Sequence, residues 1–94
     1  MTESQIQKQI IDYLKLSGYL VFRMNSGKAR NNIRLCPPGT PDLLAINGRK
    51  NIWIEVKTKN GKLNEDQIYM HGELARLREK VIVARNLDDI REYI

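Results

Sequence analysis

The chain contains few of the residues on which several common functional sites depend. Cys36 is the only cysteine and His71 the only histidine among 94 residues. This excludes an internal disulfide, a cysteine zinc site and a histidine-rich metal site. No apolar run approaches the roughly 18 residues of a transmembrane helix, and the first residues lack the basic-then-apolar order of a signal peptide. We therefore expect a soluble cytoplasmic protein without membrane partners, and we interpret Cys36 and His71 as structural or incidental.

The length allows one domain, spanning residues 1–94. A chain this short buries only about 60–65% of the surface that its unfolded form exposes, so its core is small. A partner subunit would enlarge the buried surface.

Acidic residues are scarce in the middle of the chain. The formal net charge is +5, and residues 13–64 contain ten Lys or Arg but only two acids, Asp42 and Glu55. An excess of positive charge favours a polyanionic partner such as nucleic acid. Two isolated carboxylates within such a stretch are the first indication of a functional site.

Hydrophobic periodicity and capping residues predict a mixed α/β domain of order αβββαβ with a trailing helix. In chain order, we expect a helix from the N-cap Thr2 to Gly18, strands at 19–25, 42–46 and 51–58, a helix from the N-cap Asn64 to about Glu79, a short buried strand at 80–84 and a final short helix after Asn86. A loop of about 16 residues, 26–41, separates the first two strands. Loops of that length in compact domains are usually functional or disordered.

The second and third strands are expected to form a hairpin around Asn47-Gly48. If residues 47–50 are the loop, Asp42 lies directly opposite Glu55; a two-residue loop would instead place Glu55 on the diagonal. Side chains alternate across a strand, so both registers put Asp42, Glu55 and Lys57 on one face. The core face is then formed by Leu43, Ala45, Ile52, Ile54 and Val56.

Two carboxylates directly opposed across strands repel each other, unless a cation lies between them. Mg²⁺ binds to one or two carboxylates, keeps several waters and suits a phosphate substrate. It can activate a water and stabilise charge on a phosphodiester. Lys57, one pleat from Glu55, would orient the attacking water or offset developing negative charge. Asp42, Glu55 and Lys57 thus predict a phosphodiester-hydrolysing site.

Glu3 is a further candidate metal ligand. Around the first helix it lies within about 20° of Ile10 and Leu14, so it is expected on the face that meets the domain. The alternative is that Glu3 only stabilises the helix dipole. Gln67 also has two possible roles, because it is a candidate catalytic residue and at the same time fits the capping box of the second long helix.

The motif Pro41-Asp42 followed by Glu55-Val56-Lys57 resembles the signature of the PD-(D/E)xK nuclease superfamily. The resemblance is narrower to its VRR-NUC branch and rests on Arg23, Asn25, Gly27, the segment 39–44, the segment 54–58, Gly61 and Gln67. It spans nearly the whole chain and implies a restriction-endonuclease-like αβββαβ core with a mixed sheet and a short C-terminal helix. In that family Asp42, Glu55, the Val56 carbonyl and an acid of the first helix hold the metal. Lys57 serves the water and Gln67 assists.

The resemblance implies a Mg²⁺- or Mn²⁺-dependent endonuclease without an organic cofactor. Stand-alone members of that branch are structure-selective, often phage-borne, and include Holliday-junction resolvases. The function we expect is therefore resolution of branched DNA in a bacterial or phage-infected cytoplasm, leaving 5′-phosphate and 3′-hydroxyl ends. A flap or nicking nuclease, a non-catalytic DNA-binding module and a structural subunit of a larger nuclease complex remain alternatives.

We expect the DNA backbone to be bound by basic and polar residues of the long loop and the strand before it, and by two lysines after the third strand. These are Arg23, Asn25, Ser26, Lys28, Arg30, Arg34, Lys59 and Lys62. A homodimer is also expected, because junction resolution needs two cuts and a two-fold dimer supplies two sites. The final helix carries Leu87, Ile90, Tyr93 and Ile94, more apolar surface than such a helix usually needs, so it either forms the dimer contact or packs on its own sheet.

Overall fold

The computed structural model describes residues 1–24 and 36–94. The expected order of elements is confirmed, with the strands shorter than their sequence patterns. The elements are α1 (Glu3–Leu16), β1 (Leu20–Arg23), β2 (Leu43–Ile46), β3 (Asn51–Val56), α2 (Glu65–Arg76), β4 (Lys80–Ala84) and α3 (Leu87–Tyr93). Both long helices begin at the predicted caps: the Thr2 and Asn64 side chains accept hydrogen bonds from the backbone of Gln5 and Gln67, in complete capping boxes.

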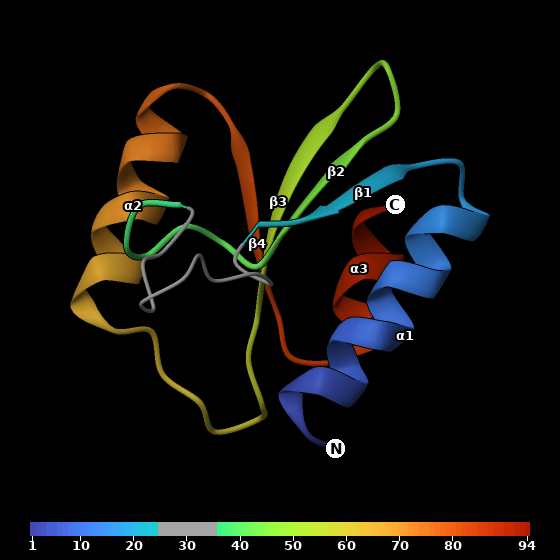
Figure 1. The fold of residues 1–94 in the computed structure, drawn as a ribbon, viewed down its shortest axis with the longest axis horizontal. Helices are drawn as coiled ribbons and strands as arrows, with labels where there is room; N and C mark the ends of the chain where they lie inside the picture. The colour runs from blue at the N-terminus through green and yellow to red at the C-terminus, as the bar shows by residue number, and fades with distance from the viewer. Residues whose placement is uncertain (25–35) are drawn as a thin grey trace, which may run out of the picture.

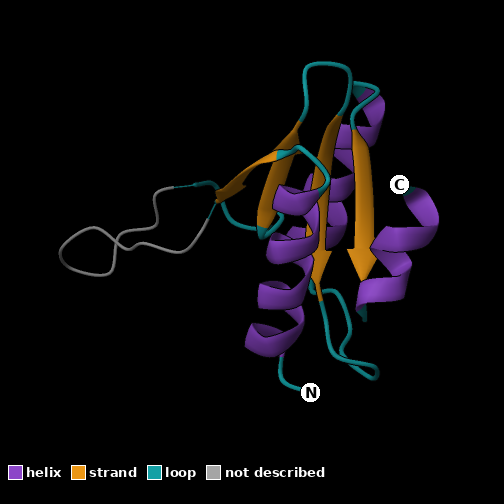
Figure 2. Ribbon diagram, turned by 90° about the vertical axis from the view of Figure 1, so that its right-hand side faces the viewer, coloured by secondary structure: helices purple, strands orange, loops and turns teal. Residues whose placement is uncertain are grey.

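The four strands form one mixed sheet in the order β1-β2-β3-β4. The β1–β2 and β2–β3 pairs are antiparallel, and β3–β4 is parallel. Helices α1 and α3 pack together on one face, whereas α2 lies on the other face against β4 (Figures 1 and 2). The domain is therefore a three-layer α/β/α arrangement in which α2 alone covers part of the second face.

The hydrophobic core lies between the sheet and the α1–α3 pair. The predicted core face of the hairpin is confirmed, since its five side chains are at most 1% exposed. The core cluster consists of Ile6, Ile10, Ile11, Leu14, Tyr19, Leu43, Ala45, Ile52, Ile54, Val56, Ala84 and Ile90. Burying apolar side chains is the main favourable contribution to folding. This core consequently fixes which side chains the hairpin presents to the other face.

A four-residue loop closes the hairpin, which selects one of the two registers considered. Ile46 pairs with Asn51 and Leu43 with Ile54. The Asn47 side chain accepts hydrogen bonds from the backbone N–H groups of Arg49 and Lys50. Gly48 has φ +89°, a conformation that favours glycine. Continuing the register by one residue places Asp42 opposite Glu55.

Two expectations about the C-terminal part were wrong. Strand β4 is an edge strand whose side chains are mostly half-buried, rather than a buried strand. Helix α3 packs on its own sheet and on α1, and Ile90 is fully buried in the chain's own core with Leu87 and Tyr93 packed against it. Only Ile94 remains 40% exposed. The apolar side chains of α3 therefore complete the small core of this chain.

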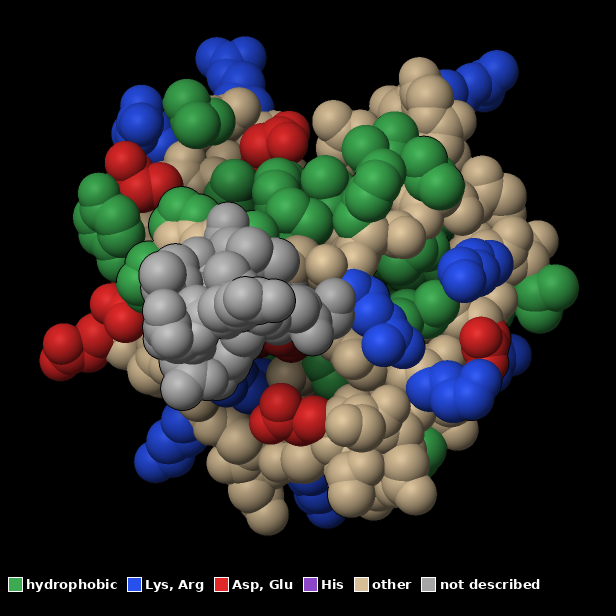
Figure 3. Space-filling model, viewed as in Figure 1, with side chains coloured by type: hydrophobic (Ala, Val, Ile, Leu, Met, Phe, Trp, Pro, Cys, Tyr) green, Lys and Arg blue, Asp and Glu red, His purple; other side chains and the backbone are tan. Residues whose placement is uncertain are grey.

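Exposed apolar surface is found instead on the other edge strand. Leu20 and Phe22 of β1 are 62% and 43% exposed. Their register partners are Ile46 and Leu44, so all four side chains share the face opposite the core. Figure 3 shows hydrophobic side chains gathered in a band over the strands on one side of the molecule. No helix in the described part of the chain combines the length and apolar character needed to cross a bilayer.

Candidate active site

Asp42 lies one residue before β2, where it is anchored to both neighbouring strands. Its Oδ2 atom accepts a hydrogen bond from the backbone N–H of Val56 at 2.8 Å. Its own carbonyl oxygen accepts one from the backbone N–H of Met24 at 2.9 Å. The carboxylate is thus held at the end of β3, beside Glu55.

Glu55 is the one buried charged or polar residue in the described part of the chain, with 2% of its surface exposed. It points to the second face of the sheet, where α2 provides its partners. The Gln67 side-chain amide donates a hydrogen bond to Oε2 at 3.4 Å, and His71 Nε2 is hydrogen-bonded to Oε1 at 3.2 Å. Both carboxylate oxygens are therefore oriented by one helix.

Burial raises the pKa of Glu55 from 4.5 to about 8, reinforced by hydrogen bonding to Asp42 and by repulsion from its charge. Lys57 acts in the opposite direction, and Glu3 raises the pKa slightly further. Burial also lowers the pKa of His71 below 6.5, so its imidazole is neutral at pH 7. Without a cation, Glu55 consequently retains a proton near neutral pH, although the site is built from acids.

Lys57 follows the last residue of β3, and its backbone N–H donates to the carbonyl of Ala84 at 3.0 Å. This bond extends the β3–β4 pairing beyond the strands. Its side chain is half-buried. Lys57 is close enough to lower the pKa values of both Glu55 and His71 through its charge. The structure therefore brings together the three residues that the sequence predicted, Asp42, Glu55 and Lys57.

Gln67 has both of the roles that the sequence left open: it caps α2 and it contacts the site. Its Oε1 accepts a hydrogen bond from the backbone N–H of Asn64, which completes the cap of α2, while its Nε2 reaches Glu55. His71 is the residue that the sequence analysis missed at the site. It lies one helical turn after Gln67, and residues four apart share a helix face. That spacing, applied to the chain's only histidine, was the available signal.

Glu3 lies at the first position of α1 and is exposed, not directed into the domain as expected. Its charge is felt by Glu55. Within residues 1–24 and 36–94, however, no three His, Cys, Asp or Glu side chains are close enough to form a metal-binding group. Asp42 and Glu55 are thus a pair rather than part of an acidic cluster.

The pair is nevertheless suited to a divalent cation. Two carboxylates are hard oxygen donors, and Mg²⁺ is usually held by one or two such groups with waters and substrate phosphate completing the shell. The Val56 carbonyl belongs to the same short segment as Glu55. A cation between the carboxylates would also remove the repulsion that raises the pKa of Glu55.

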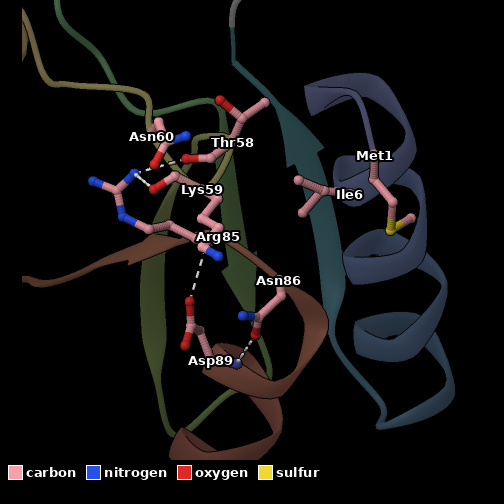
Figure 4. Close-up of a pocket in the computed structure, with 8 residues that line it drawn as sticks. All are labelled: Met1, Ile6, Thr58, Lys59, Asn60, Arg85, Asn86 and Asp89. Carbon is pink, nitrogen blue, oxygen red and sulfur yellow. Dashed lines mark hydrogen bonds between the residues drawn. The ribbon is translucent and has the colours of Figure 1, made fainter.

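The segment that follows β3 is held in place by Arg85 (Figure 4). One guanidinium nitrogen, Nη1, donates to the carbonyls of Thr58 and Gly61, both at 2.7 Å, and to that of Lys59 at 3.3 Å. The backbone N–H of Arg85 donates to Asp89 Oδ2 at 2.8 Å. A cavity of about 580 Å³ lies here, lined by Thr58, Lys59, Asn60, Arg85, Asn86 and Asp89 and, on the α1 side, by Met1 and Ile6. The path of the chain directly after Lys57 is therefore fixed from β4.

The candidate DNA-binding residues are only partly visible. Lys59 and Lys62 are exposed on the segment that Arg85 holds, and Arg23 is exposed at the end of β1. The remaining candidates, Asn25, Ser26, Lys28, Arg30 and Arg34, lie outside the described residues.

Gly39, in the loop before Asp42, packs closely against the backbone at the start of α2. It has φ +84°, and a Cβ atom added there would lie 2.1 Å from the backbone oxygen of Asp66 and 2.9 Å from the backbone nitrogen of Gln67. Only a residue without a side chain allows this approach. The close contact sets the position of the α2 N-terminus, and hence of Gln67, relative to Asp42.

No protein-family model matches the chain, and no curated protein is similar to it in sequence. Among solved structures, a chain described as a VRR_NUC domain is similar over 98% of this chain and 94% of its own length. The TM-score is 0.75 and the sequence identity is 23%. This likeness shows that the chain has the fold of that domain, as the sequence resemblance implied.

Proposed function

We propose that this protein is a divalent-metal-dependent DNA endonuclease that hydrolyses phosphodiesters at the site formed by Asp42, Glu55 and Lys57. The observation that carries the proposal is the pairing of the two carboxylates at the ends of β2 and β3, with Lys57 beside them. Support also comes from the +5 charge and from the fold, which a VRR_NUC domain shares. The description of the similar protein as a VRR_NUC domain indicates that it is a nuclease domain.

Asp42 and Glu55, with the Val56 carbonyl, would hold Mg²⁺ or Mn²⁺, and Glu3 is a candidate to join them through a water. When bound, the cation supplies Lewis acidity toward the phosphate and a lower pKa for a water. The chain's own residues position the reactants. Gln67 and His71 orient Glu55, and the backbone N–H of Val56 orients Asp42.

Lys57 Nζ would donate a hydrogen bond to the attacking water and offset negative charge on the phosphate. The water oxygen forms a bond to phosphorus as the bond from phosphorus to the 3′ oxygen breaks. The water loses a proton to solvent, and the leaving oxygen takes one up. The products are a 5′-phosphate and a 3′-hydroxyl.

Lys57→Arg should slow cleavage by about 10²–10³-fold while DNA affinity stays near the wild-type value, because a planar guanidinium cannot replace a compact ammonium.

The substrate we propose is branched DNA, with four-way junctions preferred. The test is a panel of labelled duplex, flap, fork and four-way-junction DNAs incubated with Mg²⁺ and with EDTA. Wild-type protein should cut the junction fastest, and only with Mg²⁺. Asp42→Asn and Glu55→Gln should abolish cutting, whereas Asp12→Asn, an exposed acid on α1, should cut normally. Preferred cutting of flaps or single nicks would support the alternative nuclease, and binding without cutting would indicate a DNA-binding module.

We further propose a homodimer, since resolving a junction needs one cut in each of two opposing strands. Because α3 completes the chain's own core, the exposed Leu20 and Phe22 of edge strand β1 are the apolar residues that we assign to the contact. Sedimentation should give a dimer for wild type and a monomer for Leu20→Ser/Phe22→Ser. A wild-type monomer, both alone and on junction DNA, would contradict the dimer.

A further inference from the structure

A basic groove lies at the hairpin end of the sheet, away from the candidate active site. It has a volume of about 600 Å³, and the residues that line it are Ile46, Gly48, Arg49, Lys50, Asn51, Arg78, Glu79, Lys80 and Tyr93. Four of these carry positive charge and one carries negative charge. They come from the hairpin loop, from the turn after α2, from the start of β4 and from the end of α3.

The Tyr93 ring contacts two of the lysines. Lys50 Nζ lies 5.3 Å and Lys80 Nζ 5.0 Å from the centre of the Tyr93 ring. Each contact is a favourable cation–π interaction, yet the two like charges repel each other. An anion bound beside both ammonium groups would relieve that repulsion.

In the described part of the chain, no acidic side chain forms an ion pair with a cation of the groove. Across residues 1–24 and 36–94, the ion pairs are Lys8–Asp12, Arg76–Glu73 and Arg91–Asp88. Glu79, the single acid, accepts a hydrogen bond from Trp53 Nε1 at 3.1 Å and is directed to that ring. The net charge that the groove presents to a ligand is therefore positive.

A second cavity shares lining residues with this groove and is also lined by His71 of the candidate active site. It has a volume of about 460 Å³ and is lined by His71, Ala75, Arg78, Glu79, Lys80, Val81 and Val83. His71, which is hydrogen-bonded to Glu55, lines one part of this cavity. Arg78, Glu79 and Lys80 line both this cavity and the basic groove. The second cavity lies between α2 and β4, and the basic groove extends from the shared residues around the start of β4 to Tyr93 at the end of α3.

Strand geometry gives the length of this path. Asn51, at the groove, and Glu55, at the site, are four residues apart on β3, which corresponds to about 13 Å. Base pairs of duplex DNA rise about 3.4 Å along the helix axis, so a duplex whose axis follows this path advances by about four base pairs between the site and the groove.

We propose that this groove is a second binding site for the phosphate backbone of DNA, which holds the duplex about four base pairs from the phosphodiester that is cut. The proposal rests on the proposed nuclease function, because it assumes that DNA is the ligand. Lys50, Lys80 and Arg78 neutralise phosphates, and the Tyr93 ring keeps the two lysines in position. Base identity plays no part, since backbone contacts carry no sequence information.

The test is the salt dependence of binding of a labelled four-way junction to wild-type protein and to Lys50→Gln/Lys80→Gln, with EDTA present to prevent cutting. Each lost phosphate contact makes the slope of log K against log salt shallower by about 0.9, so the pair should reduce it by about 1.8. The matched control is Lys8→Gln/Lys15→Gln, which removes two exposed charges from α1 and should keep the wild-type slope.

Arg78→Gly provides a variant that is expected to fold. Arg78 has φ +64°, where glycine is more stable than arginine, so the substitution removes the charge without introducing backbone strain. It should reduce the slope by about 0.9 with an unchanged or higher thermal midpoint. Wild-type slopes for Arg78→Gly and for the lysine pair, with normal DNA binding and cutting, would overturn the groove and leave the nuclease function standing. A wild-type protein that does not bind DNA would overturn both.

Discussion

The Oδ2 atom of Asp42 accepts a hydrogen bond from the backbone N–H of Val56 at 2.8 Å, across the hairpin that brings Asp42 to Glu55. The bond gives the carboxylate a structural role beside its chemical one. Asparagine can retain the bond through its amide oxygen, whereas alanine leaves the N–H of a buried residue without that acceptor. Asp42→Ala should therefore be less stable than Asp42→Asn by about 1–3 kcal/mol. Urea unfolding measures this difference, and equal stabilities would show that the bond contributes nothing.

The contact of Gly39 with the start of α2 predicts a position-specific effect of alanine. Gly39→Ala should destabilise the protein well beyond the roughly 1–2 kcal/mol that alanine costs at a positive φ, because its Cβ would overlap the backbone of Asp66. Cleavage should also decline, since Gln67 would shift away from Glu55. The matched control is Gly48→Ala, at φ +89° with nothing within 4 Å of its Cβ. Thermal midpoints of both variants test the contact, and equal losses would argue against it.

Stability without divalent metal should fall as the pH rises from 6.5 to 8. Burial, and then Asp42, raise the folded-state pKa of Glu55 from 4.5 to about 8, so the folded protein holds a proton that the unfolded chain releases. This stabilisation is complete below pH 4.5 and is lost as the pH rises through 8. The lowered pKa of His71 acts in the opposite direction, but its contribution is complete above 6.5.

Thermal midpoints in EDTA at pH 6.5 and pH 8 test this expectation. The wild-type midpoint should be lower at pH 8, and Glu55→Gln, which cannot lose a proton, should show a smaller difference between the two values. Adding Mg²⁺ at pH 8 should raise the wild-type midpoint. A wild-type midpoint that is constant or rises toward pH 8 in EDTA would show that Glu55 is ionised across this range.

The three carbonyl contacts of Arg85 predict that it positions the DNA-binding segment after Lys57. Arg85→Met retains an unbranched aliphatic chain but removes the guanidinium that donates to the carbonyls of Thr58 and Gly61. The lost hydrogen bonds should lower the free energy of unfolding by about 1–3 kcal/mol. The KM for DNA should rise more than kcat falls, because Lys59 lies on this segment. Arg91→Met, which removes an exposed arginine from α3, is the control. A variant with lower stability but unchanged KM would limit Arg85 to a structural role.

The sequence predicted most of the fold because its local signals agree with one another. The capping boxes at Thr2 and Asn64 and the alternation along the hairpin appear in the structure, whereas the loop length at Asn47, which the sequence left open, is decided by the structure as four residues. Alternation alone was enough to put Asp42 and Glu55 on one face, since the opposite face had to form the core. The order of elements followed from these assignments.

The errors concern contacts between elements that are distant in sequence. The apolar side of α3 had two possible partners, another subunit or the chain's own α1 and β4, and no local pattern distinguishes them. The role of His71 was missed for a related reason, because the packing of α2 over Glu55 is a tertiary arrangement. Glu3 was expected on the inner side of α1 from helical spacing, but the structure leaves it exposed, three residues before the first buried position of the helix, Ile6.

The central claim is that Asp42 and Glu55 hold a divalent cation, and Mn²⁺ binding followed by electron paramagnetic resonance tests it most directly. Protein that binds Mn²⁺ removes the signal of the free hydrated ion, and the measurement requires neither DNA nor cleavage. Wild-type protein and Asp12→Asn should reduce the free-ion signal equally, whereas Asp42→Asn and Glu55→Gln should leave most of it. If wild-type protein leaves the signal unchanged, or if all four proteins reduce it equally, the two carboxylates do not form the metal site.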